Sequence, residues 1–198
     1  MDAQDRLYTL IPLTEFKAVL GIDDREDPLS RFVLITSTYT IEQYCKRRLL
    51  KRANLEYLDF WGDGVLPLRE YPVRRIMGVY QTRKPAAPLS PELYYCIPEC
   101  GAGEDIPGCL AVRPEAGLRR GERAVKVRYL AGYDAGKVPA DLASACMELA
   151  AWNMSRYRGR RIGMTGAVRG KAAEGEHLES SMPENVRALL EPYRRHTI

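Results

Sequence analysis

The order of apolar and polar residues predicts a strand followed by a helix in the second half of the chain. Val125, Val127 and Tyr129 are spaced two residues apart, which is the period of a strand with one apolar face. Glycines end this strand, and a helix is predicted over 140–158. Its stripe recurs at three- and four-residue steps and contains Leu142, Ala145, Cys146, Leu149, Trp152 and Asn153. A stripe that is mostly apolar must face a core.

Two helices are predicted near the start of the chain. A short helix over 14–20 begins at Thr14, which can cap it, and ends at Gly21. A longer helix over 28–48 follows, with Asp27 as its cap. This second segment is rich in β-branched residues, but it is too long for a strand and contains no turn signal, so its length favours a helix.

A last helix is predicted over 183–194, where Pro183 suits the first helical position. Its apolar stripe contains Val186, Leu189, Leu190 and Tyr193. The preceding stretch, from 159 to 182, is rich in glycines and bases and has almost no periodicity, which is typical of an arm that a partner orders. Together these segments form a predicted C-terminal arm over 159–198.

The middle of the chain, 54–131, predicts an antiparallel β subdomain. Pro- and Gly-rich turns separate its strand candidates, which lie at 55–60, 65–68, 75–83, 93–97, 109–113 and 123–130. The sequence Trp61-Gly62-Asp63-Gly64 is a strong turn signal, and it predicts that the first two candidates form a hairpin.

The sequence therefore predicts a single α+β domain, 1–198, in which a helical core carries an inserted β subdomain. The β subdomain is an insertion because the helical segments on its two sides need one another to bury their apolar stripes. A chain of 198 residues buries roughly 70% of its unfolded surface, enough for a core without a metal or disulfide staple. Its five cysteines, an odd number, also argue against a disulfide framework.

The composition is that of a soluble globular protein of a reducing compartment, with 28% charged and 45% hydrophobic residues. No secretory signal is expected at the N-terminus, because no basic stretch precedes a long apolar one. No aliphatic run approaches the ~20 residues that span a bilayer. A net charge of +4 does not by itself indicate a nucleic-acid partner.

No catalytic or metal-binding constellation is evident in the sequence. Cys96, Cys100 and Cys109 have no fourth ligand near them, and His177 and His196 lie far along the chain. No nucleophile-elbow, metalloprotease or dinucleotide motif occurs. Enzyme activity, a cofactor and a metal are therefore not expected.

Three separate segments together resemble the head–tail connector, or adaptor, proteins of long-tailed bacteriophages and prophages. The first reads V-R-Y-L-A-G-Y over 127–133, V-P-A-D-L over 138–142 and L-A-A-W over 149–152. The second is L-T-E-F-K-A-V-L-G-I over 13–22, with I-E-Q-Y-C-K-R-R closing the next helix over 41–48, and the third is M-P-E-N-V-R-A-L-L-E-P-Y-R-R over 182–195. The order and spacing of these segments carry the resemblance, which covers about half of the chain.

The resemblance implies a structural protein of the virion neck that is assembled in the host cytoplasm. In this family, subunits form a ring of about a dozen copies between the portal protein and a tail-side connector or tail terminator protein. Genomic DNA passes through the ring, so non-specific contact with DNA in the channel is implied, and no membrane is involved.

Six arginines and one tyrosine in the C-terminal quarter of the chain are the candidate docking residues for the portal or a neighbouring subunit. The set comprises Arg156, Arg158, Arg160, Arg161, Tyr193, Arg194 and Arg195. Arginine forms bidentate pairs with carboxylates and stacks on aromatic faces, and a repeated arm gains affinity around a ring. The plainer interpretation is that these residues are helix-end charges and solvated surface.

The alternative function is a small nucleic-acid-binding protein that uses the basic patch from Arg156 to Arg161, with Tyr157 interleaved to stack on a base. No groove-reading motif accompanies this patch. Salt-dependent binding of free DNA would favour this alternative.

Overall fold

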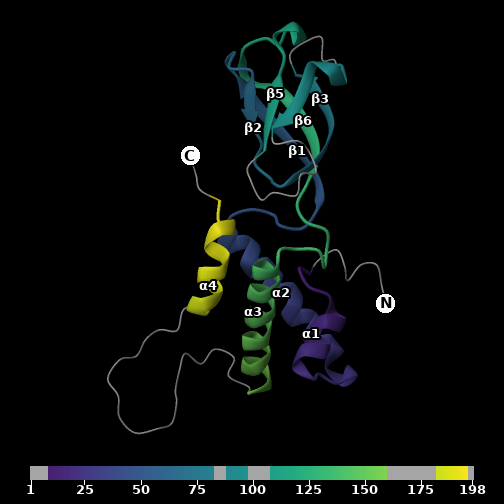
Figure 1. The fold of residues 1–198 in the computed structure, drawn as a ribbon, viewed down its shortest axis with the longest axis vertical. Coiled ribbons are helices and arrows are strands. Elements are labelled where there is room, and N and C mark those ends of the chain that lie inside the picture. Colours follow the sequence, from purple (N-terminus) through teal and green to yellow (C-terminus); the bar gives the residue numbers. More distant parts are fainter. Residues whose placement is uncertain (1–8, 83–87, 98–107, 160–181, 196–198) are drawn as a thin grey trace, which may run out of the picture. The chain divides into compact units, whose positions relative to one another are not determined.

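A computed structural model describes residues 9–82, 88–97, 108–159 and 182–195 (Figure 1). Within these residues the helices are α1 (Leu13–Leu20), α2 (Asp27–Cys45), α3 (Ala140–Arg158) and α4 (Glu184–Leu190). The strands are β1 (Arg52–Phe60), β2 (Val65–Pro67), β3 (Val73–Gln81), β4 (Tyr94–Ile97), β5 (Cys109–Val112) and β6 (Gly121–Ala131). The predicted α+β class is confirmed.

The chain divides into two compact units. The helical unit contains Met1–Lys46 and Ala135–Ile198, and the β unit contains Arg47–Asp134. The β-rich segment predicted over 54–131 thus lies inside the β unit. Most of the predicted arm, at 160–181, lies outside the described residues.

Antiparallel packing of α2 against α3 forms the centre of the helical unit. Near the start of α2, the rings of Phe32 and Tyr157 meet edge to face, with centroids 5.6 Å apart. One turn further along, the side-chain amide of Asn153 donates a hydrogen bond of 3.1 Å to the Ser37 hydroxyl. Most of the stripe positions predicted for both helices are buried: Leu34, Ile41 and Cys45 on α2, and Leu142, Ala145, Cys146 and Leu149 on α3. Trp152 and Asn153, also predicted for the α3 stripe, are only partly buried. Helix α1 contacts α2, and α4 contacts both α3 and α2.

The helix ends differ from the prediction by a few residues. Pro12, not Thr14, is the N-cap of α1, so Thr14 lies within the helix. Gly21 ends α1 as predicted, at a φ of 61° that glycine adopts without steric cost. Helix α2 begins at Asp27, which was predicted to be its cap, and ends at Cys45 rather than at 48, because Lys46 turns into the left-handed region with a φ of 55°. Helix α4 is shorter than predicted, and a 3-10 turn continues it from Glu191 to Tyr193.

The β unit contains two three-stranded antiparallel sheets, in the orders β1-β6-β3 and β2-β5-β4. The predicted hairpin of the first two strands is therefore wrong. The chain does turn after Phe60, but β1 pairs with β6 whereas β2 pairs with β5 in the other sheet. A turn signal fixes a local bend, while the partner of each strand depends on which apolar faces meet in the core.

The two sheets share a core around Tyr129, which is fully buried on the central strand β6. Its hydroxyl donates to the Glu56 carboxylate and accepts a hydrogen bond of 3.0 Å from the backbone N–H of Glu70. Burial raises the pKa of Tyr129 far above its usual value, so the phenol remains a neutral donor. Strand β1, through Glu56, and the segment before β3, through Glu70, are thus both hydrogen-bonded to one buried side chain of β6.

Arg47 follows the end of α2 in the chain, but its side chain belongs to the β unit. Because α2 ends at Cys45, Arg47 lies in the β unit, where only 3% of the residue is exposed. Its guanidinium donates to the Tyr71 carbonyl at 2.9 Å and lies 3.9 Å from the centre of the Tyr71 ring. Lys51, four residues later, pairs with Asp134. These cations therefore stabilise the β unit itself.

Leu149 tests the packing of the helical unit, since it is completely buried on α3. We expect Leu149→Asp to lower the free energy of unfolding by several kcal/mol, because an unpaired carboxylate would be buried. The volume-conserving Leu149→Met should cost less than about 1.5 kcal/mol. Denaturant unfolding followed by circular dichroism measures both variants. An unchanged midpoint for Leu149→Asp would remove Leu149 from the core.

Candidate interaction surfaces

The first group of predicted docking residues lies in the last turn of α3. The guanidinium of Arg156 lies 4.5 Å from the centre of the Trp152 ring, one turn earlier on the same helix. Arg158 forms an ion pair with Glu26, whose Oε2 accepts from the Arg158 Nε at 3.0 Å. Both arginines are therefore oriented by neighbours within the helical unit.

The second group follows α4 and is more deeply embedded. Tyr193 is buried, and its hydroxyl donates to the Asp141 carboxylate at the start of α3. The guanidinium of Arg194 lies 5.7 Å from the centre of the Tyr44 ring. The backbone N–H of Arg195 donates to the Cys45 carbonyl at 2.9 Å, which satisfies a carbonyl at the end of α2.

These contacts place the two groups at opposite ends of the α2–α3 pair. Arg158 meets Glu26, just before α2, whereas Arg195 meets Cys45, the last residue of α2. A helix of 19 residues is roughly 28 Å long at 1.5 Å per residue. The predicted residues therefore do not form one patch. Arg160 and Arg161 lie outside the described residues, and the docking role of the set remains a prediction.

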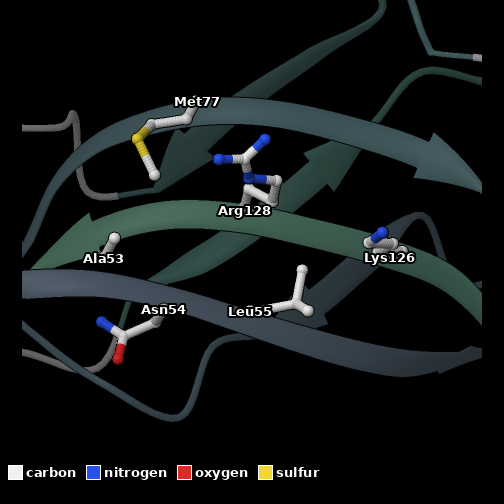
Figure 2. Close-up of a pocket in the computed structure, with 6 residues that line it drawn as sticks. All are labelled: Ala53, Asn54, Leu55, Met77, Lys126 and Arg128. Carbon is white, nitrogen blue, oxygen red and sulfur yellow. The ribbon is translucent and has the colours of Figure 1, made fainter.

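A further surface, on the outer face of the β1-β6-β3 sheet, was missed by sequence reasoning. A depression of about 370 Å³ on this face is lined by Ala53, Asn54, Leu55, Met77, Lys126 and Arg128. Figure 2 shows Met77, Arg128, Lys126 and Leu55 side by side over three adjacent strands, with the two cations on the central strand. The alternation of cations with buried valines in β6 is the sequence signal for this face. What the sequence did not reveal is that exposed Leu55 and Met77 flank those cations.

The helical unit has a groove of about 510 Å³ between α1, α3 and the segment that precedes α3. Its apolar lining includes Val19, Val138 and Met147. The charged residues of the lining are Glu15 and Glu148, both acidic. Val19, on α1, is 62% exposed.

Potential metal ligands and cysteines are the remaining chemical groups of interest in the described part of the chain. No group of three or more potential metal ligands occurs among the described residues. Cys146 is buried, and burial raises the pKa of its thiol to about 12, so it is protonated at neutral pH and is not a nucleophile. Cys45 is also buried, while Cys96 and Cys109 are partly exposed. None of the described helices is both long enough and apolar enough to span a bilayer.

Chains of known structures share this fold over nearly their whole length. A chain in the neck of an empty GTA particle, computed with C6 symmetry, is 21% identical with a TM-score of 0.59, and the match covers 96% of this chain and 91% of that one. A chain in the virion of a native gene transfer agent (GTA) particle is 20% identical with a TM-score of 0.61, at the same coverage. A chain in the neck of a native GTA particle, computed with C12 symmetry, is 20% identical with a TM-score of 0.57, covering 100% and 94%.

The chain has the fold of gene transfer agent neck proteins. The resemblance to head–tail connectors is thereby confirmed at the level of the fold. No protein-family model matches the chain, and a search of curated proteins finds no relative. The neck-protein fold is thus evident from the three-dimensional structure at an identity of only about one residue in five.

The burial of α4 generates a test of its role. Leu190 is completely buried, whereas the neighbouring Leu189 is only partly buried. We expect Leu190→Ala to lower the free energy of unfolding by about 2–5 kcal/mol, and Leu189→Ala to lower it clearly less. Denaturant unfolding of the two variants makes the comparison. Equal and small losses would show that α4 is not part of the core of the helical unit and leave it available for a partner.

Proposed function

We propose that this protein is a structural subunit of a phage-like virion neck, where it forms an oligomeric ring between the portal and the tail-side proteins. The observation that supports the proposal is the whole-chain fold match to neck proteins, since it covers 96–100% of this chain and 91–94% of theirs. Both units are included in that match. Two of the matched particles were computed with C6 and C12 symmetry, which agrees with a ring.

Docking to the ring's partners is assigned to the basic side chains at the two ends of the α2–α3 pair. Arg156 stacks on Trp152 and Arg158 pairs with Glu26, so each presents a partly pre-oriented guanidinium. Such ordering reduces the entropy that a partner must remove on binding. Tyr193 contributes indirectly in this proposal, because its buried hydroxyl holds the segment that carries Arg194 and Arg195.

Electron microscopy of portal-bearing heads that lack a neck tests the proposed function. We expect the purified protein to bind these heads and form a ring on the portal, because a neck subunit must recognise that surface. A protein of similar size and charge serves as the control. Absence of the protein from the heads, together with salt-dependent binding of free DNA, would instead support the nucleic-acid-binding alternative.

The predicted docking set also includes Arg160 and Arg161 of the arm, and reversing their charges tests this part of the assignment. We expect Arg160→Glu combined with Arg161→Glu to reduce attachment to portal-bearing heads at physiological salt by on the order of tenfold or more, because like charges across an interface are costly. The matched control is Arg69→Glu with Arg119→Glu, which changes the net charge equally at exposed positions of the β unit. Co-sedimentation with heads measures attachment. Undiminished attachment of the arm variant would refute the arm's role in docking.

A further inference from the structure

We infer that the outer face of the β1-β6-β3 sheet of one copy packs into the α1–α3 groove of the next copy. The inference rests on the proposed ring and assigns its subunit contact to two particular surfaces. Each surface lies wholly within one unit: the sheet face in the β unit and the groove in the helical unit. The occupant that we assign to each surface is a second copy of this chain.

The sheet face is both apolar and basic. Leu55 on β1 is 52% exposed, and Met77, at a register shift of β3 between Ile76 and Gly78, is 41% exposed. Between them, Lys126 and Arg128 are the charged residues among the described residues that line the depression. Long cationic side chains can cover apolar surface with their stems while the charged groups contact a partner. This combination suits a partner that is apolar and acidic.

The groove of the helical unit has that complementary character. Val19, Val138 and Met147 give it an apolar lining, and Glu15 and Glu148 give it two negative charges and no positive one. Its volume of about 510 Å³ leaves room for side chains of the size of Leu55 and Met77. Two cations therefore oppose two anions, and exposed apolar side chains are present on both surfaces.

Charge also determines how copies would associate. Two sheet faces repel one another, and so do two grooves, so a symmetric dimer through either surface is disfavoured. A sheet face and a groove attract, which produces a heterologous, head-to-tail contact. Such contacts close into rings when the rotation between copies permits. The same arrangement that excludes a two-fold dimer thus favours a ring.

Charge reversal of each surface separately provides the test. Variant A carries Lys126→Glu and Arg128→Glu, and variant B carries Glu15→Lys and Glu148→Lys. We expect each variant alone to self-associate on the order of a hundredfold more weakly than the unchanged protein, because every contact would place like charges together. Sedimentation equilibrium at high protein concentration and ring counting on portal-bearing heads measure assembly, and thermal melting confirms that the variants fold. Arg69→Glu with Arg119→Glu again serves as the control.

Mixing the two variants then restores assembly if the assignment is correct. Variant A would present two acidic surfaces and variant B two basic surfaces, so A and B should alternate in a 1:1 assembly. A chain carrying all four substitutions should assemble by itself, because its sheet face would be acidic and its groove basic. Assembly of A or B alone at the level of the unchanged protein would overturn the inference, as would failure of both the mixture and the four-substitution chain.

The failure of this inference is distinguishable from failure of the proposed function. If the unchanged protein does not bind portal-bearing heads, the neck function fails and the ring contact fails with it. If the unchanged protein forms rings on the heads and variants A and B form them equally well, the neck function stands and only the assignment of the two surfaces is overturned.

Discussion

The packing of α2 against α3 is the contact on which the helical unit depends, because it joins segments that lie on opposite sides of the β unit in sequence. The free-energy cost of closing such a loop grows only slowly with its length. Two matched apolar stripes can therefore hold the unit together despite the long insertion. Helices α1 and α4 pack onto this pair. Loss of the α2–α3 contact would leave neither of these short helices with a surface to cover.

The β unit has an analogous centre in strand β6, which pairs with β1 on one side and with β3 on the other. Tyr129 lies on this strand, and its hydroxyl joins the Glu56 carboxylate to the backbone of Glu70. Both hydrogen bonds are partly buried, and they satisfy the Tyr129 hydroxyl as donor and as acceptor. The inward face of β6 is thus committed to packing, while its outward face retains Lys126 and Arg128.

Sequence periodicity predicted the positions of the helices and most strands, because each depends on local spacing of apolar residues. The prediction of α3 was accurate to the residue. Strand pairing was not predictable in the same way: the turn after Phe60 is real, yet β1 finds its partner in β6, more than sixty residues later. Arg47 illustrates the same limit, since nothing local to it indicates that Tyr71 supplies both a carbonyl and a ring for its guanidinium.

The candidate surfaces were likewise predictable from the sequence only in part. Individual residues such as Arg158 and Arg194 could be selected from the sequence by charge and position, but their separation by the length of α2 could not. The sheet face requires strands from three parts of the chain, and the groove requires α1 beside the start of α3. Surfaces assembled from distant segments become visible only when the fold has brought those segments together.

The two ends of the β unit are tied to each other by hydrogen bonds. The backbone N–H of Tyr133 donates to the Leu49 carbonyl, and the N–H of Lys51 donates to the Tyr133 carbonyl, each at 2.7 Å. Gly132 permits this approach, because a Cβ there would lie 2.7 Å from the backbone of Leu49 and Leu50. The chain thus enters and leaves the β unit at adjacent points. Segments of different size could be exchanged at this junction during evolution while the spacing between α2 and α3 stayed the same.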